Sequence, residues 1–238
     1  MSDLSNAFSA AFHLVATGDP GLFEIIALSL KVSLISVVLA ALIGMPVGAL
    51  LAVHRFPGRS VIIVGANALM GLPPVVAGLL VYMLVSNSGP LGVLQLLYTP
   101  AAMIIAQTVL ITPIILSLTL QSIEDLQTEY DEHLRMLGLS SMERAATLIY
   151  EGRTSLIMAL LAGFGRAIAE VGAVMIVGGN INHVTRTMTT AIALETSKGD
   201  LALAVGLGLV LVTLALGING LAHFVRARPQ WSHGMALR

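Results

Sequence analysis

Apolar residues run through this chain in long stretches that a few short polar segments separate. Val32–Val53 is 22 residues without a charge, and Ser60–Ile123 is 64 residues without one. A helix needs about 20 apolar residues to cross the hydrocarbon core of a bilayer. The first stretch therefore predicts one membrane span and the second predicts two. The uncharged run at 201–225 predicts another.

Polar breaks between these runs divide the chain into five spans. The sequence Ser-Asn-Ser-Gly-Pro at 86–90 has turn chemistry and divides the longest run. Leu91–Tyr98, just after it, predicts a short interfacial or re-entrant piece. We therefore predict an all-α fold, a polytopic bundle of membrane helices. The spans are expected at 22–53, 60–85, 101–121, 154–177 and 201–225.

Prolines lie inside several of these spans. Gly71-Leu72-Pro73-Pro74 is expected to interrupt the second span and Thr112-Pro113 the third, while Pro46 lies near the end of the first. Non-helical backbone at membrane depth survives only where protein buries it or where it lines a cavity. Each site is either a packing kink or a bend beside a transport pathway, and the sequence leaves both open.

Composition also indicates a membrane protein. Of 238 residues, 56% are hydrophobic and 11% are charged, whereas a soluble domain has about 25% charged residues. The net charge of −1 gives nucleic-acid binding no electrostatic support, and the absence of cysteine excludes disulfides and cysteine-based sites. We expect an N-terminal extracytoplasmic segment at 1–21, one membrane domain at 22–225 and a cytoplasmic tail at 226–238.

Basic residues give the orientation. Eight arginines follow the first, third and fifth spans, while only Arg186 and Lys198 lie in the loop between the fourth and fifth. Cytoplasmic loops are enriched in Lys and Arg, so a multi-pass protein of the plasma (inner) membrane is predicted, with its N-terminus outside and its C-terminus in the cytoplasm. Residues 1–21 are either an amphipathic surface helix or a loosely ordered tail. Lys31 is expected to snorkel to the near surface, beside Glu24.

Charge is concentrated in one predicted cytoplasmic stretch, 123–153, which holds ten of the 25 charged residues. Gly138 fits a helix C-cap, and Ser140-Ser141-Met142-Glu143 has the S-x-x-E form of a capping box. The third span is thus expected to continue as an amphipathic helix, followed by a second helix, as a hairpin with its tip at 137–142. The apolar face of the first helix is Ile123, Leu126, Tyr130, Leu134 and Leu137.

Two further groups of polar residues could contribute to function. Arg166 and Glu170 lie four residues apart within the fourth span, where each charge costs about 3 kcal/mol in lipid. They form either a structural ion pair or part of a pathway in which Arg166 attracts an anion. The segment 180–200 supplies hydroxyls and Arg186, which suit an anion, the acidic rim of a docking protein, or a capped surface helix.

Catalytic patterns are absent from the sequence. There is no G-x-x-x-x-G-K-[ST] phosphate-binding loop, so the chain is not expected to bind ATP by that route. The six histidines show no metal-ligand spacing, and no nucleophile or acid–base pair is present, so no catalytic residue, metal or cofactor is expected in this chain. A secondary transporter is less favoured, because five spans cannot divide into equal inverted repeats. A membrane enzyme is the least favoured.

Four stretches of the sequence resemble a known family. Glu132-His133-Leu134-Arg135-Met136-Leu137-Gly138 resembles the E-A-A-x-x-x-G core of the cytoplasmic loop in permease subunits of type I ABC importers, with His133 and Leu134 in place of the alanines. In that family this loop carries the coupling helix, which docks on the ATPase subunit. The amino-acid sequences of 165–173, 177–181 and 185–192 resemble those of permeases of molybdate and tungstate importers, most of all the tungstate branch.

The resemblance implies a five-span type I permease core with a cytoplasmic coupling-helix hairpin. The function implied is that of a non-catalytic subunit of an ATP-driven tungstate importer, with molybdate or another oxyanion as the alternative. The implied partners are a second copy of the chain, two ATPase subunits that bind ATP and Mg²⁺, an extracytoplasmic oxyanion-binding protein and the lipid membrane, but no nucleic acid. The residues expected to contact the ATPase are Glu132, Leu137, Gly138, Leu139, Ser140 and Met142. The pathway or anion candidates are Arg166, Glu170, Thr185, Arg186 and Thr189.

Overall fold

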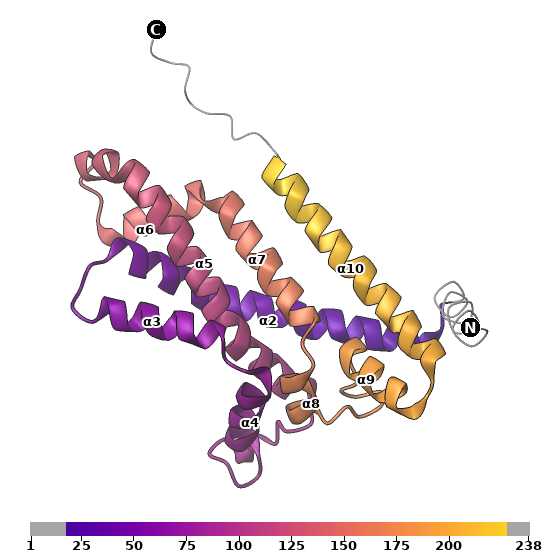
Figure 1. The fold of residues 1–238 in the computed structure, drawn as a ribbon. Coiled ribbons are helices and arrows are strands. Elements are labelled where there is room, and N and C mark those ends of the chain that lie inside the picture. Colours follow the sequence, from indigo (N-terminus) through magenta and orange to yellow (C-terminus); the bar gives the residue numbers. More distant parts are fainter. Residues whose placement is uncertain (1–17, 228–238) are drawn as a thin grey trace.

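The computed structural model describes residues 18–227, apart from the side chains of 131–133, 135 and 225–227. Over that range the chain forms nine α-helices, one short 3-10 helix and no strand, which confirms the all-α prediction (Figure 1). The predictions for residues 1–17 and for the tail beyond 227 lie outside the described residues.

The first long helix is α2 (Pro20–Val53), and its start is well capped. Asp19 Oδ1 accepts a hydrogen bond from the backbone N–H of Leu22 at 2.9 Å, and proline is pre-organised for the first helical position. The helix continues through Pro46. A Cβ added to Gly48 would lie 2.6 Å from the carbonyl oxygen of Leu116. This glycine therefore allows α2 to cross the helix that contains Leu116 at close range.

The second predicted span consists of two helices, α3 (Arg59–Met70) and α4 (Pro74–Val85). They meet at an angle of 104° across residues 71–73, where the sequence predicted an interruption. Figure 1 shows α4 turning away from α3. Tight packing fixes this turn, because a Cβ on Gly78 would lie 2.7 Å from Cα of Ala173. The break is thus larger than an ordinary proline kink.

A 3-10 turn, η1 (Gly92–Leu94), leads into α5 (Pro100–Met136), the longest helix. The predicted interruption at Pro113 is wrong, since α5 runs through this residue unbroken. In membrane helices, neighbouring helices can satisfy the backbone around a proline, and here α2 packs along α5. The predicted continuation of the third span as a helix is confirmed.

The fourth predicted span is a bent pair of helices, so the expectation that Arg166 and Glu170 share one continuous helix is wrong. After α6 (Ser141–Glu151), the chain forms α7 (Arg153–Ile168) and α8 (Gly172–Gly178), which are bent by 58° at residues 169–171. The cause is local, because Glu170 Oε1 accepts the N–H of Ala173 at 3.2 Å. Its carboxylate thus satisfies a backbone donor at the start of α8, which competes with continuing the helix.

The chain ends in α9 (Met188–Lys198) and α10 (Leu201–Ala227), which pack on one another, and α10 also packs on α7. Three helices (α2, α5 and α10) are long and apolar enough to cross a membrane, and the two bent pairs raise the total to five for residues 18–227. This agrees with a polytopic membrane bundle. The α5–α6 hairpin projects at one end of the molecule and α9 lies toward the other (Figure 1).

Candidate functional site

The turn between α5 and α6 has the predicted capped geometry. Gly138 has φ +64°, in the left-handed region that glycine adopts without cost. Ser140 Oγ accepts the N–H of Glu143 at 3.4 Å, while Glu143 Oε2 accepts the hydroxyl and the backbone N–H of Ser140 at 2.7 and 2.8 Å. The hydroxyl bond first, and the backbone bond second, hold the pKa of Glu143 below its ordinary value. The predicted capping box is confirmed.

Apolar side chains at this hairpin divide into a packed base and an uncovered tip. Ile123, Leu134 and Leu148 are buried in one core cluster, and Leu139 packs against it. The predicted apolar face of α5 is thus only partly buried, because Tyr130 and Leu137 are exposed. Four large side chains at the tip and on α6 are 66–78% exposed: Met136, Leu137, Met142 and Tyr150. Among the candidate ATPase contacts, the side chain of Glu132 lies outside the described residues.

The base of the hairpin is tied to the ends of α2 and α3. Arg59 forms an ion pair with Glu124 on α5, and its Nε donates to the carbonyl oxygen of Leu51 at 2.6 Å. His54 Nδ1 lies 3.2 Å from Ser141 Oγ, within hydrogen-bond distance. The Arg59 contacts fix the base to the rest of the helical bundle, and the His54 contact reaches Ser141 at the tip.

Arg166 and Glu170 pair as predicted, with Nη1 and Oε2 2.6 Å apart. The prediction that both residues lie on one helix is wrong, because Arg166 lies in α7 and Glu170 lies in the bend after it. The Glu170 side chain is buried, whereas that of Arg166 is 37% exposed. Removing the arginine would therefore leave the buried carboxylate of Glu170 without its ion-pair partner. The guanidinium of Arg166 itself still reaches the surface of the bundle.

The candidate threonines use their hydroxyls within the fold. Thr185 is fully buried, and its Oγ1 donates to the carbonyl oxygen of Gly178 at 2.6 Å. Thr189 is also buried and donates to the backbone carbonyl of Glu170 at 2.7 Å. This second bond connects the start of α9 to the bend between α7 and α8. Both hydroxyls thus hold the loop and α9 against the bundle.

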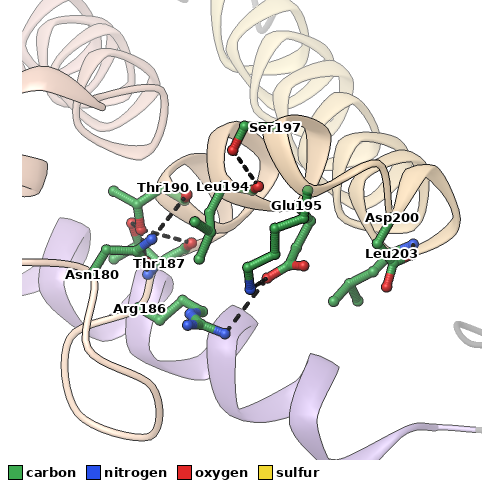
Figure 2. Close-up of polar contacts among 10 residues, drawn as sticks. Asn180, Arg186, Thr187, Thr190, Leu194, Glu195, Ser197, Asp200 and Leu203 are labelled. Carbon is green, nitrogen blue, oxygen red and sulfur yellow. Dashed lines mark hydrogen bonds and ion pairs between the residues drawn. The ribbon is translucent and has the colours of Figure 1, made fainter.

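Arg186 lies between these threonines and points toward α9. Its Nη1 is 3.7 Å from Glu195 Oε1, which also accepts a hydrogen bond from Lys198 Nζ at 3.0 Å. Figure 2 shows Arg186 reaching toward the carboxylate of Glu195, beside the Thr187–Thr190 cap of α9. Residues 188–198 thus form a capped helix, as one of the alternatives expected.

Sequence reasoning missed a cavity beside Arg186. A pocket of about 410 Å³ is lined by one face of α2, by residues 182–184 and 186, and by Leu203. Lys31 and Glu24 both line it, but the expected proximity of the two does not produce a pair, since Glu24 Oε2 lies 2.6 Å from His183 Nδ1 instead. Their spacing along α2 indicated a shared face. It could not reveal the loop that packs there.

The apolar helices and the projecting hairpin define a polytopic α-helical membrane protein, and residues 18–227 show no cluster of side chains suited to a metal ion. Residues 44–230 match the family described as the inner membrane component of binding-protein-dependent transport systems. The chain belongs to this family. The resemblance to ABC permeases is thereby confirmed.

Similar proteins cover nearly the whole chain. It is 40% identical over 229 residues to a probable anion ABC transporter permease protein of Haloferax volcanii, covering 93% of this chain and 99% of the relative. It is 39% identical to the tungstate uptake system permease protein TupB of Peptoclostridium acidaminophilum, covering 94% and 98%. It is also 39% identical to the TupB protein of Campylobacter jejuni, covering 92% and 91%.

Proposed function

We propose that this chain is the transmembrane permease subunit of an ATP-driven tungstate importer. Two copies form the translocation pathway, and each copy couples to a separate ATPase subunit that binds ATP and Mg²⁺. The chain itself carries out no catalysis. Molybdate or another oxyanion is the alternative substrate, and a secondary transporter is a less favoured class. Similarity to two tungstate uptake permeases and one anion permease supports the choice of substrate.

The uncovered tip of the hairpin is the observation that carries this proposal. Large apolar side chains on a hairpin outside the bundle mark a site of protein contact, because water disfavours a contiguous apolar patch. Leu137 and Met142 are 70% and 67% exposed, while the base below them is packed and tied to α2 through Arg59. A rigid base with an apolar tip suits docking on the ATPase. The proposed orientation puts this tip in the cytoplasm.

The pathway needs a second copy, because one bundle of five spans is too small to enclose a route for an anion. Arg166 suits the wall of that route, since its guanidinium is partly exposed at the bend between α7 and α8 while Glu170 holds it in place. Thr185 and Thr189 support the proposal only indirectly, as hydrogen bonds that hold the segment bearing Arg186.

The proposed mechanism transmits a movement of the ATPase pair to the membrane. ATP-driven closure brings the two hairpins together, and the unbroken α5 passes this displacement to the spans. The bends at 71–73 and 169–171 are non-helical and suit the change between inward-facing and outward-facing arrangements. An extracytoplasmic oxyanion-binding protein then releases its anion into the open route.

Uptake competition in cells that carry the complete system tests the substrate. Tungstate uptake should be blocked by excess unlabelled tungstate and less strongly by molybdate or sulfate. Equal competition by all three anions would refute tungstate specificity in the system, and uptake that persists when the ATPase is inactive would refute ATP coupling.

Docking is tested by co-purification with the ATPase subunit. Met142→Glu places a charge in the tip and should abolish co-purification and permease-dependent ATP hydrolysis. Phe56→Glu is the matched control, because Phe56 is an exposed apolar residue in the other predicted cytoplasmic turn. Equal loss in both variants, or in neither, would contradict docking at the tip.

A further inference from the structure

The cavity beside α2 has the size and wall of a ligand site. Its volume of about 410 Å³ falls in the range of about 300–1,000 Å³ that is usual for small-molecule pockets. Apolar side chains form much of the wall, and the charged residues that line it come from two separate segments, the start of α2 and residues 182–186. The cavity is also far larger than the space for one water molecule, about 10–15 Å³, so it can hold a hydrated ion.

Arg186 brings an unsatisfied guanidinium to this cavity. The residue is half-buried, with 17% of its side chain exposed, and its Nε is fully buried without a hydrogen-bond partner among residues 18–227. The nearest carboxylate oxygen, on Glu195, is 3.7 Å from Nη1, which is beyond hydrogen-bond distance. Glu195 is instead hydrogen-bonded to Lys198. Because Nε is fully buried, a ligand in the cavity meets the exposed part of this guanidinium, whose ion pair with Glu195 is long within residues 18–227.

Lys31 supplies a second cation from the opposite wall. It lines the same cavity and is exposed, and none of the ion pairs found in the described part of the chain includes it. The acidic groups of the wall are already engaged. Glu24 is bonded to His183 at 2.6 Å, and Asp19 Oδ1 accepts the N–H of Leu22 at 2.9 Å. Both carboxylates keep their charge, but the charged groups of the lining that can donate hydrogen bonds to a ligand are Lys31 and Arg186.

We propose that this cavity binds a tetrahedral oxyanion between Lys31 and Arg186. Arginine presents a planar fork of donors to such an anion, and lysine adds a compact point charge. The oxyanion is either a free inorganic ion such as tungstate or the phosphate of a lipid headgroup whose chains lie along the apolar wall. The inference rests on the proposed function only for the choice of tungstate as the free ion. It assigns an anion site away from the Arg166–Glu170 pair.

Titration of the purified full-length permease with sodium tungstate tests the free ion. The protein is delipidated in detergent, and binding is measured by isothermal titration calorimetry. Lys31→Gln and Arg186→Gln should each weaken binding about tenfold or more, because each removes a charge-assisted hydrogen bond. Arg55→Gln is the matched control, since it removes one arginine charge from an exposed turn outside the cavity and should leave binding unchanged.

Native mass spectrometry of the protein extracted in mild detergent tests the lipid phosphate. The probe is phosphatidylglycerol in vesicles of phosphatidylcholine and phosphatidylglycerol. The wild type and Arg55→Gln should retain one anionic lipid more than Lys31→Gln and Arg186→Gln. Loss of tungstate binding in both cavity variants identifies the free ion, and loss of the retained lipid in both identifies the headgroup. Either result supports the proposal.

The proposal is overturned if neither probe responds to both cavity substitutions, or if Arg55→Gln weakens binding as much as they do. Should Arg186→Gln fail to fold, Lys31→Gln decides alone, because an exposed lysine on α2 can be replaced without disturbing the core. Tungstate uptake by cells that carry the complete system tests the proposed function separately. Wild-type tungstate uptake with no anion bound in the cavity would refute this inference but not the proposed function. Anion binding in the cavity without tungstate uptake would refute the proposed function but not this inference.

Discussion

Replacing Gly138 with valine perturbs one backbone angle and nothing else in the described chain. The residue has φ +64°, and a Cβ built there meets no atom within 4 Å. The cost is therefore the left-handed conformation itself, about 1–2 kcal/mol for a non-glycine residue, and valine adopts it least readily because it is β-branched. A change of this size shifts the equilibrium between the native turn and other turns about 5–30-fold. The packed base of the hairpin should keep the helices folded.

Tungstate uptake and permease-dependent ATP hydrolysis in proteoliposomes measure the effect. We expect both to fall several-fold in Gly138→Val, with normal membrane insertion, and to recover largely in Gly138→Asn, because asparagine tolerates the left-handed region. Gly58→Val is the matched control, since Gly58 has φ +93° and is equally open, but lies outside the tip. Wild-type uptake in Gly138→Val, or an equal loss in the Gly58 variant, would refute coupling through this tip.

Four further predictions concern contacts within the bundle and the hairpin. Ser140→Ala removes the cap of α6 and should lower its local stability by about 1 kcal/mol, measured by amide hydrogen exchange. The lowered pKa of Glu143 stabilises the hairpin above the pKa of the unfolded state and ceases to do so as pH falls through the folded pKa, so the protection factors of the α6 amides, corrected for the intrinsic exchange rate, should fall in acid. Arg166→Leu should abolish uptake while ATPase docking persists, and adding Glu170→Gln should restore thermal stability but not uptake. Gly78→Ala should lower stability by about 1–3 kcal/mol, because its Cβ would overlap α8.

Three of these predictions have an internal control. Ser140→Thr keeps the capping hydroxyl and should behave like the wild type. Gly65→Ala, in α3 with no atom within 4 Å, should cost nothing where Gly78→Ala destabilises. If the double change at 166 and 170 restored uptake as well as stability, the arginine would be purely a structural partner of the carboxylate.

Local patterns were sufficient for much of the fold. Uncharged runs predicted the spans because lipid tolerates few charges, and the capped turn was readable because Ser140 and Glu143 satisfy each other within four residues. The pairing of Arg166 and Glu170 followed from their spacing and from the cost of an isolated charge in lipid. These signals share one property, since each depends on neighbours along the chain.

Features set by distant segments could not be read in the same way. Pro113 suggested a break that the structure does not contain, because the path of a helix around proline depends on what packs against it. The bend at 169–171 depends on the carboxylate of Glu170 reaching the start of α8. The cavity at Lys31 required the meeting of α2 with a loop about 150 residues later, which no local pattern encodes.

The unbroken α5 is a long lever arm. Its 37 residues give a length of about 55 Å, so a tilt about its Pro100 end displaces the hairpin by about 1 Å per degree. Arg59 binds the hairpin base to the end of α2 and the start of α3, and His54 contacts Ser141 at the tip, so these helix ends follow the hairpin. Changes of angle between helices are then confined to the two breaks, at residues 71–73 and 169–171. The stiffness of these two breaks determines how far the helices beyond them move when the hairpin is displaced.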